Sequence, residues 1–560
     1  MPPMDLPFDT TKTDAELAVT REREEEDIAR MLSEKYGMTY ADLAMHPVDV
    51  DALRVIPEAD ARAAQAAAFE KSAKHLSLAV HNPGNPALAK LLEDLAARDY
   101  AVKQFLVSER GLNKALSRYA DLSYATESKP GVFAVAPETL NRLTSETTSK
   151  SALRAELDAA VAEKSLDRVS RVLELIFAGG LALRASDLHF EPEEEATRLR
   201  LRLDGILVEA YRFDPATYHQ LNSRLKLLAA VKLNVTNRPQ DGRFSLERGD
   251  RAVEVRASFI PGAYGESIVL RLLDPETTQH PFTELGIQEK LLARLEREIK
   301  RPNGMLLTTG PTGSGKTTTL YSFLREIQSP DIKIITIEDP IEYHLAGIVQ
   351  TQVDGKKYTF AEGLRSIVRQ DPDVIMVGEI RDGETADIAI QAALTGHYVF
   401  STLHTNDAAG TFPRLADLGA DPKSFGSAVT VSMAQRLLRR LDPAQRKERP
   451  LTEAEKAMIA KVFEGFPDAS LIPQNPTTVW DPAPATADDT GYHGRIGLYE
   501  AIFMDDALAN FLRDNPPEQE IRKAVAKQGY LSMAQDGILK ALAGTTSLAE
   551  VAATVDLPQA

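Results

Sequence analysis

Cysteine is missing from all 560 residues, which excludes disulfide bonds and thiolate zinc sites. Its absence also fits a reducing compartment. No apolar run is long: the longest, 175–183, has nine residues, whereas a membrane span needs about twenty. Residues 1–13 have neither a basic start nor an apolar core, so no signal peptide is predicted. We therefore expect a soluble protein.

Positive charge is also in short supply. The chain carries 65 basic and 82 acidic residues, a net charge of −17. Channels for nucleic acid need basic linings, so this balance argues weakly against a protein that moves along DNA. We expect no direct nucleic-acid partner.

Glycine is concentrated at one informative place. The apolar run 305–307 is followed by Gly310-x-x-x-x-Gly315-Lys316-Thr317, and a helical pattern starts near Thr318. Strand, glycine loop and helix start together form a phosphate cradle, in which the lysine reaches the β- and γ-phosphates and the threonine hydroxyl binds Mg²⁺. The sequence therefore predicts ATP or GTP binding. The expected binding residues are Gly310, Pro311, Thr312, Gly313, Ser314, Gly315, Lys316, Thr317 and Thr318.

The length favours three or four domains. Helix and strand patterns alternate in the first part, with an alanine-rich helix expected at 59–71, and an α+β sheet pattern follows a Ser-, Thr- and Glu-rich stretch. From residue 288 the pattern is α/β, with buried strands at 305–307, 332–337, 374–377 and 399–403, and it becomes helical past residue 428. The predicted divisions are an adaptor domain (1–122), a linker (123–160), an α+β domain (161–280), an ATPase domain (281–440) and a helical C-terminal region (441–560).

Three stretches downstream of the glycine loop suit a nucleotide hydrolase. A buried strand ends in Glu338 and Asp339, where a parallel sheet places its active site. A second apolar strand delivers Glu379 to the position of a Mg²⁺ ligand, at which aspartate is more usual. A third has His397 and His404 at its two ends, and such histidines are informative only beside the other motifs.

These stretches carry a family resemblance. The chain resembles the secretion ATPases of type II secretion and type IV pilus assembly, the GspE/PilB family, over nearly its whole length. The first 150 residues resemble the family more loosely. The shared motifs are GPTGSGKTTTL, ITIEDPIEY, RQDPDVIMVGEIRD and TGHYVFSTLHTNDA, then ASDLHFEP, RLRLDG, RPQDGRFSL and AYGESIVLRLLD upstream, and QRLLRRL and TGYHGRIGLYEAI downstream.

The resemblance implies a fold and a division of labour. The fold is α/β: a RecA-like P-loop motor domain preceded by a PAS-like α+β domain and a small N-terminal α/β domain. Glu338 becomes the expected general base, Glu379 a Mg²⁺ ligand and His404 a γ-phosphate sensor. Arg243 and Arg256 are the candidate arginines that complete a neighbouring subunit's ATP site. The family also implies a cytoplasmic homo-hexamer that is peripheral at the inner membrane, held there by a membrane platform protein and a cytoplasmic adaptor.

Two departures from the family pattern are visible. Most members carry a four-cysteine zinc site, whereas the aligned places here hold residues such as Asp442, Pro484 and Ala487. A metal-free, truncated or repacked subdomain without zinc is therefore expected. The Arg-Leu-Gly-x-x-Leu pattern with which some relatives bind cyclic di-GMP is not found in residues 1–60, so this ligand is not predicted.

The leading interpretation is a motor that uses ATP hydrolysis to assemble pilin or pseudopilin fibres. A retraction motor is an alternative, although the Ala-Ile-Arg-Asn-Leu-type motif of those relatives is absent. A DNA-uptake or conjugation ATPase is another, opposed by the acidic charge. A non-hydrolysing scaffold is disfavoured by the presence of Lys316, Glu338 and Glu379.

Overall fold

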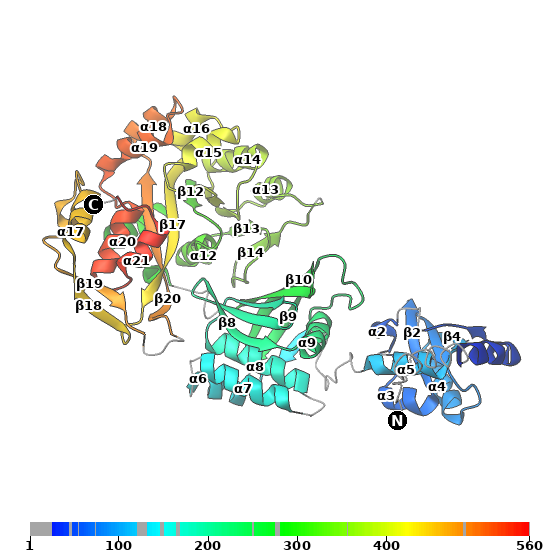
Figure 1. Cartoon of the computed structure of the whole chain (residues 1–560). Coiled ribbons are helices and arrows are strands. Elements are labelled where there is room, and N and C mark those ends of the chain that lie inside the picture. Colours follow the sequence, from blue (N-terminus) through cyan, green and yellow to red (C-terminus); the bar gives the residue numbers. More distant parts are fainter. Residues whose placement is uncertain are drawn as a thin grey trace, which may run out of the picture. The chain divides into compact units, whose positions relative to one another are not determined.

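The computed structural model shows a chain of several folded parts (Figure 1). It divides in sequence into two compact units between Leu272 and Leu273. Within the described ranges, no helix is both long enough and apolar enough to span a membrane. Residues 1–13, expected to hold no signal peptide, lie outside these ranges. The described residues are 25–43, 48–53, 55–72, 74–119, 131–145, 150–163, 168–248, 251–274, 281–355, 357–484 and 489–558.

The N-terminal part of the first unit is a small α/β sheet in the order β1-β4-β3-β2. Only β3 and β2 are antiparallel neighbours in it. The alanine-rich stretch predicted as one helix is a helix followed by a strand, because Gln65 adopts a left-handed backbone and ends α3. The strands are β1 (Thr39–Tyr40), β2 (Ala66–Ser72), β3 (His75–Val80) and β4 (Ala101–Leu106), and the helices are α2 (Val50–Leu53), α3 (Glu58–Ala64), α4 (Pro86–Ala97) and α5 (Glu109–Ser117).

The rest of the first unit is an α+β domain with a seven-stranded sheet, in the order β5-β9-β10-β11-β6-β7-β8. Inward-facing side chains alternate with polar ones along its strands, as an antiparallel sheet with one covered face requires. The strands are β5 (Val132–Ala134), β6 (Asp187–Pro192), β7 (Thr197–Leu203), β8 (Ile206–Phe213), β9 (Gln240–Arg248), β10 (Arg251–Gly262) and β11 (Gly265–Leu273), with helices α6 (Pro137–Ser145), α7 (Lys150–Ala162), α8 (Arg168–Ala182) and α9 (Pro215–Leu228).

The predicted linker 123–160 is wrong for most of its length. From residue 131 it holds β5, α6 and α7, and β5 pairs in parallel with β9. Leu140, Leu153 and Leu157 are buried in the same core as α8. The apolar residues of α6 and α7 recur at helical spacing, and the energy of burying them outweighs the polar composition that suggested a linker. Residues 123–130 lie outside the described ranges.

The second unit is built on a seven-stranded sheet in the order β14-β13-β15-β16-β12-β17-β20. All neighbouring strands in it are parallel except β17 and β20. The four buried strands predicted from apolar runs are confirmed as β12, β13, β15 and β16. The strands are β12 (Gly304–Thr309), β13 (Ile334–Glu338), β14 (Val349–Gln352), β15 (Val374–Val377), β16 (Tyr398–Leu403), β17 (Val429–Leu441) and β20 (Tyr492–Phe503).

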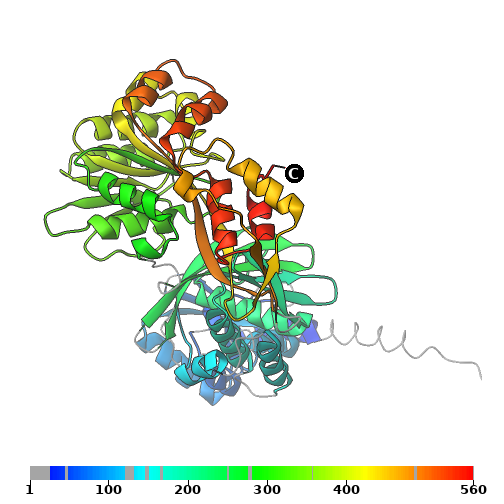
Figure 2. The same cartoon turned by 90° about the vertical axis from the view of Figure 1, so that its left-hand side faces the viewer.

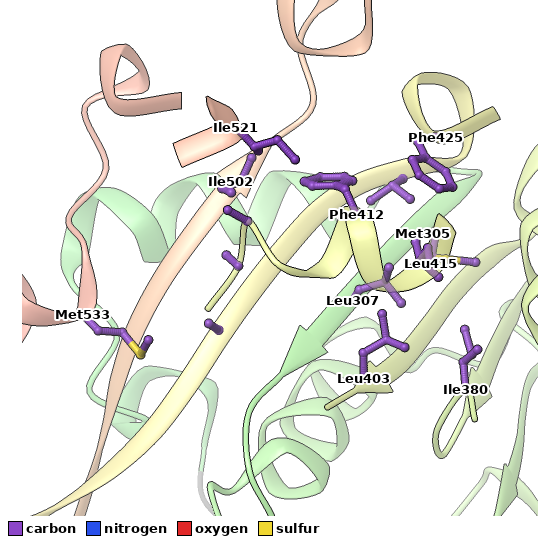
Figure 3. Packing of buried hydrophobic residues seen from close by; sticks show 14 of the residues in the cluster. Met305, Leu307, Ile380, Leu403, Phe412, Leu415, Phe425, Ile502, Ile521 and Met533 are labelled. Atoms are coloured by element: carbon purple, nitrogen blue, oxygen red, sulfur yellow. The ribbon is translucent and has the colours of Figure 1, made fainter. Parts of the chain in front are cut away.

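Helices cover both faces of this sheet. Alternate residues of β12 face opposite ways: Leu306 packs into the core with α11 and α12, and Leu307 into the core with α13 to α16. Figure 3 shows the core that contains Leu307, in which Leu307 and Leu403 lie near Phe412 and Leu415. The RecA-like α/β fold after a PAS-like α+β domain is thus confirmed. The helices are α11 (Glu289–Glu298), α12 (Lys316–Ile327), α13 (Phe360–Val368), α14 (Gly383–Leu394), α15 (Thr411–Asp417) and α16 (Pro422–Ala428).

The prediction that the chain becomes helical past residue 428 is wrong. β17 continues the seven-stranded sheet of the second unit to Leu441, and β20 returns from residue 492 as its antiparallel edge. The red C-terminal helices lie against these two strands in both views (Figures 1 and 2). Between β17 and β20 lie two antiparallel strands, β18 and β19, with α17 between them in sequence; this part is called the hairpin below. The remaining elements are β18 (Arg446–Pro450), α17 (Glu453–Val462), β19 (Thr478–Pro482), α18 (Asp506–Leu512), α19 (Glu518–Val525), α20 (Met533–Leu542) and α21 (Leu548–Thr554), with short 3₁₀ turns at Phe282–Glu284, Ala469–Leu471 and Ala526–Gln528.

Candidate nucleotide site

The glycine loop leaves the carboxyl end of β12 and enters α12 at Lys316, as predicted. Gly315 caps the helix with φ +86°, a conformation that side chains disfavour. A Cβ on Gly310 would lie 2.5 Å from the Gln435 carbonyl oxygen, so β17 also forces glycine here. The hydroxyl of Ser314 is buried without a hydrogen-bond partner among the described residues. A helix start, a bare loop and an unsatisfied donor fit a phosphate chain.

Lys316 lies in the loop with its ammonium group folded back. Its Nζ donates to the carbonyl oxygens of Gly310 (2.8 Å) and Pro311 (3.1 Å). Burial lowers the pKa of Lys316 to about 8, although Glu379 opposes the shift. Thr317 and Thr318 follow, half-buried, in the first turn of α12, while Thr312 and Gly313 are exposed at the loop tip. The nine predicted residues therefore form the loop after β12 and the first turn of α12.

Glu338 ends β13 as a buried carboxylate with three side-chain donors. Its Oε1 accepts from Thr336 Oγ1 (2.5 Å) and from Gln350 Nε2 (3.3 Å), and its Oε2 accepts from the Tyr321 hydroxyl. Burial raises the pKa of Glu338, and these hydrogen bonds work in the opposite direction. A carboxylate with a raised pKa is a better proton acceptor than an exposed one.

Glu379 and His404 lie together just beyond β15 and β16. The His404 ring Nε2 is 3.3 Å from Glu379 Oε2, and Arg381 pairs with the other oxygen of Glu379. The backbone N–H of Thr405 donates to Thr309 Oγ1 (2.8 Å), which fixes the His404 loop against the end of β12. Since β12, β13, β15 and β16 are parallel in neighbouring register, their carboxyl ends bring the loop, Glu338, Glu379 and His404 to one edge.

The second histidine of the sequence motif is at the other end of β16. His397 Nδ1 is 3.0 Å from the carbonyl oxygen of Ala392, at the carboxyl end of α14. His397 therefore makes a local structural contact at the amino end of β16, at the opposite end of the strand from His404.

The two predicted trans-acting arginines belong to the first unit. Arg243 on β9 and Arg256 on β10 are directly opposite each other in the antiparallel register. Like charges at opposite positions repel, which is a cost unless an anion or acid lies nearby. Arg243 is exposed and Arg256 is half-buried.

Sequence reasoning missed the residues that surround the predicted ones. Tyr321 and Gln350 hold Glu338, but helix and strand periodicity alone do not connect α12 or β14 to the end of β13. Gln435 and Arg436 lie against the glycine loop. They belong to the QRLLRRL motif, which was noticed, but its expected helical form gave no reason to put it beside β12.

The cysteine-free hairpin is held by ion pairs. Arg449 donates to both oxygens of Glu455 (2.7 and 2.9 Å) and to Asp481 (2.5 Å), joining β18, α17 and β19. Arg449 lowers the pKa of Glu455 to about 2. No cluster of three metal-ligating side chains occurs in the described parts of the chain. Of the aligned zinc positions, Ala487 lies outside those parts.

Comparison with known proteins finds matches to residues of both units. Residues 162–553 match the model of the family described as Type II/IV secretion system protein, and residues 36–126 match that of the MshEN domain. The type IV pilus assembly ATPase PilB of Myxococcus xanthus is 35% identical over 546 residues, 97% of this chain and 93% of that protein.

Type II secretion relatives match about two thirds of this chain. Type II secretion system protein E of Aeromonas hydrophila is 44% identical over 385 residues, 68% of this chain and 75% of that protein. The protein of the same name from Xanthomonas campestris is 43% identical over 387 residues, and the match spans 66% of its length. Among solved structures, the Legionella pneumophila ATPase DotB shares the fold, with a TM-score of 0.50 and 22% identity over 68% of this chain and 94% of that chain.

Proposed function

Since this chain belongs to the Type II/IV secretion system protein family, as an ATPase of secretion or pilus assembly, we propose that it assembles pilin fibres as a hexameric motor. The observation that carries the proposal is the meeting of Lys316, Glu338, Glu379 and His404 at one edge of the motor sheet. The match to a pilus assembly ATPase along 97% of this chain supports a type IV pilus over a type II secretion pseudopilus.

In the proposed site, the backbone N–H groups of the glycine loop and the Lys316 ammonium bind the phosphates of ATP. Lys316 exchanges the two loop carbonyls for the β- and γ-phosphates. Thr317 and Glu379 would hold Mg²⁺, which takes only one or two protein ligands in such sites. When bound, the ion neutralises charge on the phosphates.

Glu338 is the proposed general base. Glu338 exchanges the Tyr321 hydrogen bond for one from the attacking water and accepts the water's proton. The water attacks the γ-phosphate, and ADP and phosphate are the products. His404, tied to Glu379, responds to the γ-phosphate. Its link to the end of β12 through Thr405 carries that response to the strand before the loop.

Arg243 and Arg256 are proposed to reach the ATP of a neighbouring subunit. Their opposed positions put two guanidinium groups on one face of a strand pair, where both could bind one phosphate chain. An arginine supplied in trans contributes about 10³–10⁵ in rate, so hydrolysis would require the assembled hexamer.

We further propose that residues 1–122 form the adaptor-binding domain and that the motor works at the inner membrane through a platform protein. The distinct match of residues 36–126 to the MshEN domain supports a separate role for this part.

Mixing inactive variants tests the trans site. Arg243→Ala (or Arg256→Ala) subunits retain Glu338, and Glu338→Gln subunits retain the arginines. Mixed hexamers should therefore regain part of the ATPase activity that each variant lacks alone. Hexamers that form but stay inactive would refute the trans arginines. A dilute monomer with full activity would do the same.

A motor on DNA is the second candidate, and the acidic balance of 65 basic against 82 acidic residues speaks against it. Measuring ATPase activity with and without duplex and single-stranded DNA decides between the two. A several-fold stimulation that salt abolishes would favour the DNA motor. Restored pilus retraction, rather than assembly, in a cell lacking the motor would favour the retraction alternative.

A further inference from the structure

Arg436 lies beside the phosphate loop because of the strand order of the motor sheet. β17 runs parallel to β12, and Thr309 is paired with Ala434. The next residues of β17 therefore continue alongside the glycine loop. A Cβ on Gly310 would lie 3.2 Å from Arg436 Nη1, so this guanidinium lies directly against the glycine loop.

The guanidinium is held in place by neutral groups. Nη1 donates to the Gln435 carbonyl oxygen (3.1 Å) and Nη2 to that of Asn406 (2.8 Å). Within the described ranges, no carboxylate oxygen lies within 4.0 Å of Arg436. By contrast, Arg439 on the same strand forms an ion pair with Glu550 at 2.6 Å.

Arg436 is also half-buried, and burial lowers its pKa. Glu500 and Asp407 oppose that shift from a distance, and Arg436 in turn lowers the pKa of Lys316. Two like charges at one loop, one of them without a counter-ion in contact, raise the energy of the empty site. A polyphosphate between them would remove that cost, because guanidinium groups bind phosphate oxygens through fixed N–H donors.

We propose that Arg436 binds the phosphate chain of the nucleotide from within the same subunit, as a second cation beside Lys316. The proposal rests on the proposed nucleotide site. It differs from the arginines on β9 and β10, which serve a neighbour. The hydrogen bond to Asn406 also ties Arg436 to the loop after His404, so phosphate binding and the His404 loop share one side chain.

The test compares two exposed or half-exposed arginines of one strand. Arg436→Gln removes the positive charge, and Arg436→Lys keeps the charge but lacks the planar set of guanidinium donors. Arg440→Gln changes an exposed arginine on β17 and is the matched control. The affinity of each full-length protein for fluorescent ADP and ATP is measured with Mg²⁺ at fixed salt, and adenosine is measured by competition. Thermal unfolding without nucleotide checks that each variant folds.

A charge-assisted hydrogen bond to phosphate predicts a loss of at least about tenfold in Arg436→Gln for ADP, ATP or both. Arg436→Lys should lie between it and the wild type, and Arg440→Gln should bind within about twofold of wild type. If Arg436→Gln and Arg436→Lys bind both nucleotides as wild type does, the proposal is wrong. Equal losses for adenosine and ADP would also overturn it, since the contact would then be to the nucleoside. A wild-type protein that binds no nucleotide would instead refute the proposed site itself.

Discussion

Lys316 should make nucleotide affinity depend on pH within an accessible range. In the nucleotide-free protein, burial lowers the pKa of Lys316 to about 8 from an ordinary value of 10.5. The charged form is the one that binds phosphates. About nine tenths of the lysine is charged at pH 7 and about one tenth at pH 9, so affinity for ADP should fall about tenfold between these values.

Folding and binding should respond with opposite signs. Because the folded pKa of Lys316 lies below its unfolded value, the unfolded chain binds more protons between about pH 8 and 10.5. This lysine therefore makes the empty protein more stable as pH rises through that window, while nucleotide binding weakens. The nucleotide-induced rise in unfolding temperature should therefore shrink as pH rises, because it depends on the affinity of the folded protein.

The assay is a titration with fluorescent ADP from pH 7 to 9.5, together with calorimetry at pH 8 in two buffers of different ionisation enthalpy. Binding should take up about half a proton per site at pH 8. In Lys316→Arg, whose side chain stays charged, any remaining binding should not vary with pH in this way. Constant affinity from pH 7 to 9 in the wild type, with no proton uptake, would refute the reasoning.

Three further predictions concern buried or paired carboxylates. Glu338→Gln should still bind Mg-ATP in a binding titration but hydrolyse it at least about 10²-fold more slowly, because the water loses its proton acceptor. Tyr321→Phe removes a hydrogen bond that lowers the pKa of Glu338. The acid limb of the kcat/KM–pH profile, which reports the free enzyme, should therefore move to higher pH, since Glu338 must be ionised to act. Arg449→Met breaks contacts to Glu455 and Asp481 at a partly exposed site. It should cost about 1–2 kcal/mol of stability, or a few degrees in calorimetry.

Each of these has an outcome that contradicts it. Wild-type turnover by Glu338→Gln would put the base elsewhere. An unmoved or downward-shifted acid limb in Tyr321→Phe would separate Tyr321 from the proton transfer. The matched control for Arg449→Met is Lys447→Met, which changes an exposed residue of the same strand. Equal unfolding temperatures of these two variants would show that the ion pairs do not stabilise the hairpin.

The centre of the site could be predicted because its chemistry is local in the sequence. The spacing from Gly310 to Thr317 lies within one loop, and Glu338 and Glu379 directly follow strands whose apolar runs are unmistakable. Parallel strands have their carboxyl ends at one edge of the sheet, so the residues that follow them are expected to lie close together. The roles of these residues stay predictions until the variants are measured.

Other elements could not be predicted, for physical reasons. Residues 429–434 of β17 are buried on both faces, so the alternation that marks a strand is absent, and the leucines that follow have helix-like spacing. The alanines at the start of β2 have high helix propensity, but each is fully buried in the sheet. The position of Arg436 depends on which strand adjoins β12, and no local pattern encodes that neighbour.

The strand order of the motor sheet has a consequence for how the protein is made. β12 pairs with β16 and β17, and β17 pairs in turn with β20. The strands beside the glycine loop are therefore not all present until residue 503 has left the ribosome. The roughly 200 residues from β12 to β20 take on the order of 10–40 s to synthesise. During that time the apolar strand Gly304–Thr309 lacks its covering neighbours. We therefore expect the nascent second unit to need protection from aggregation, and to bind ATP only after β20 has been made.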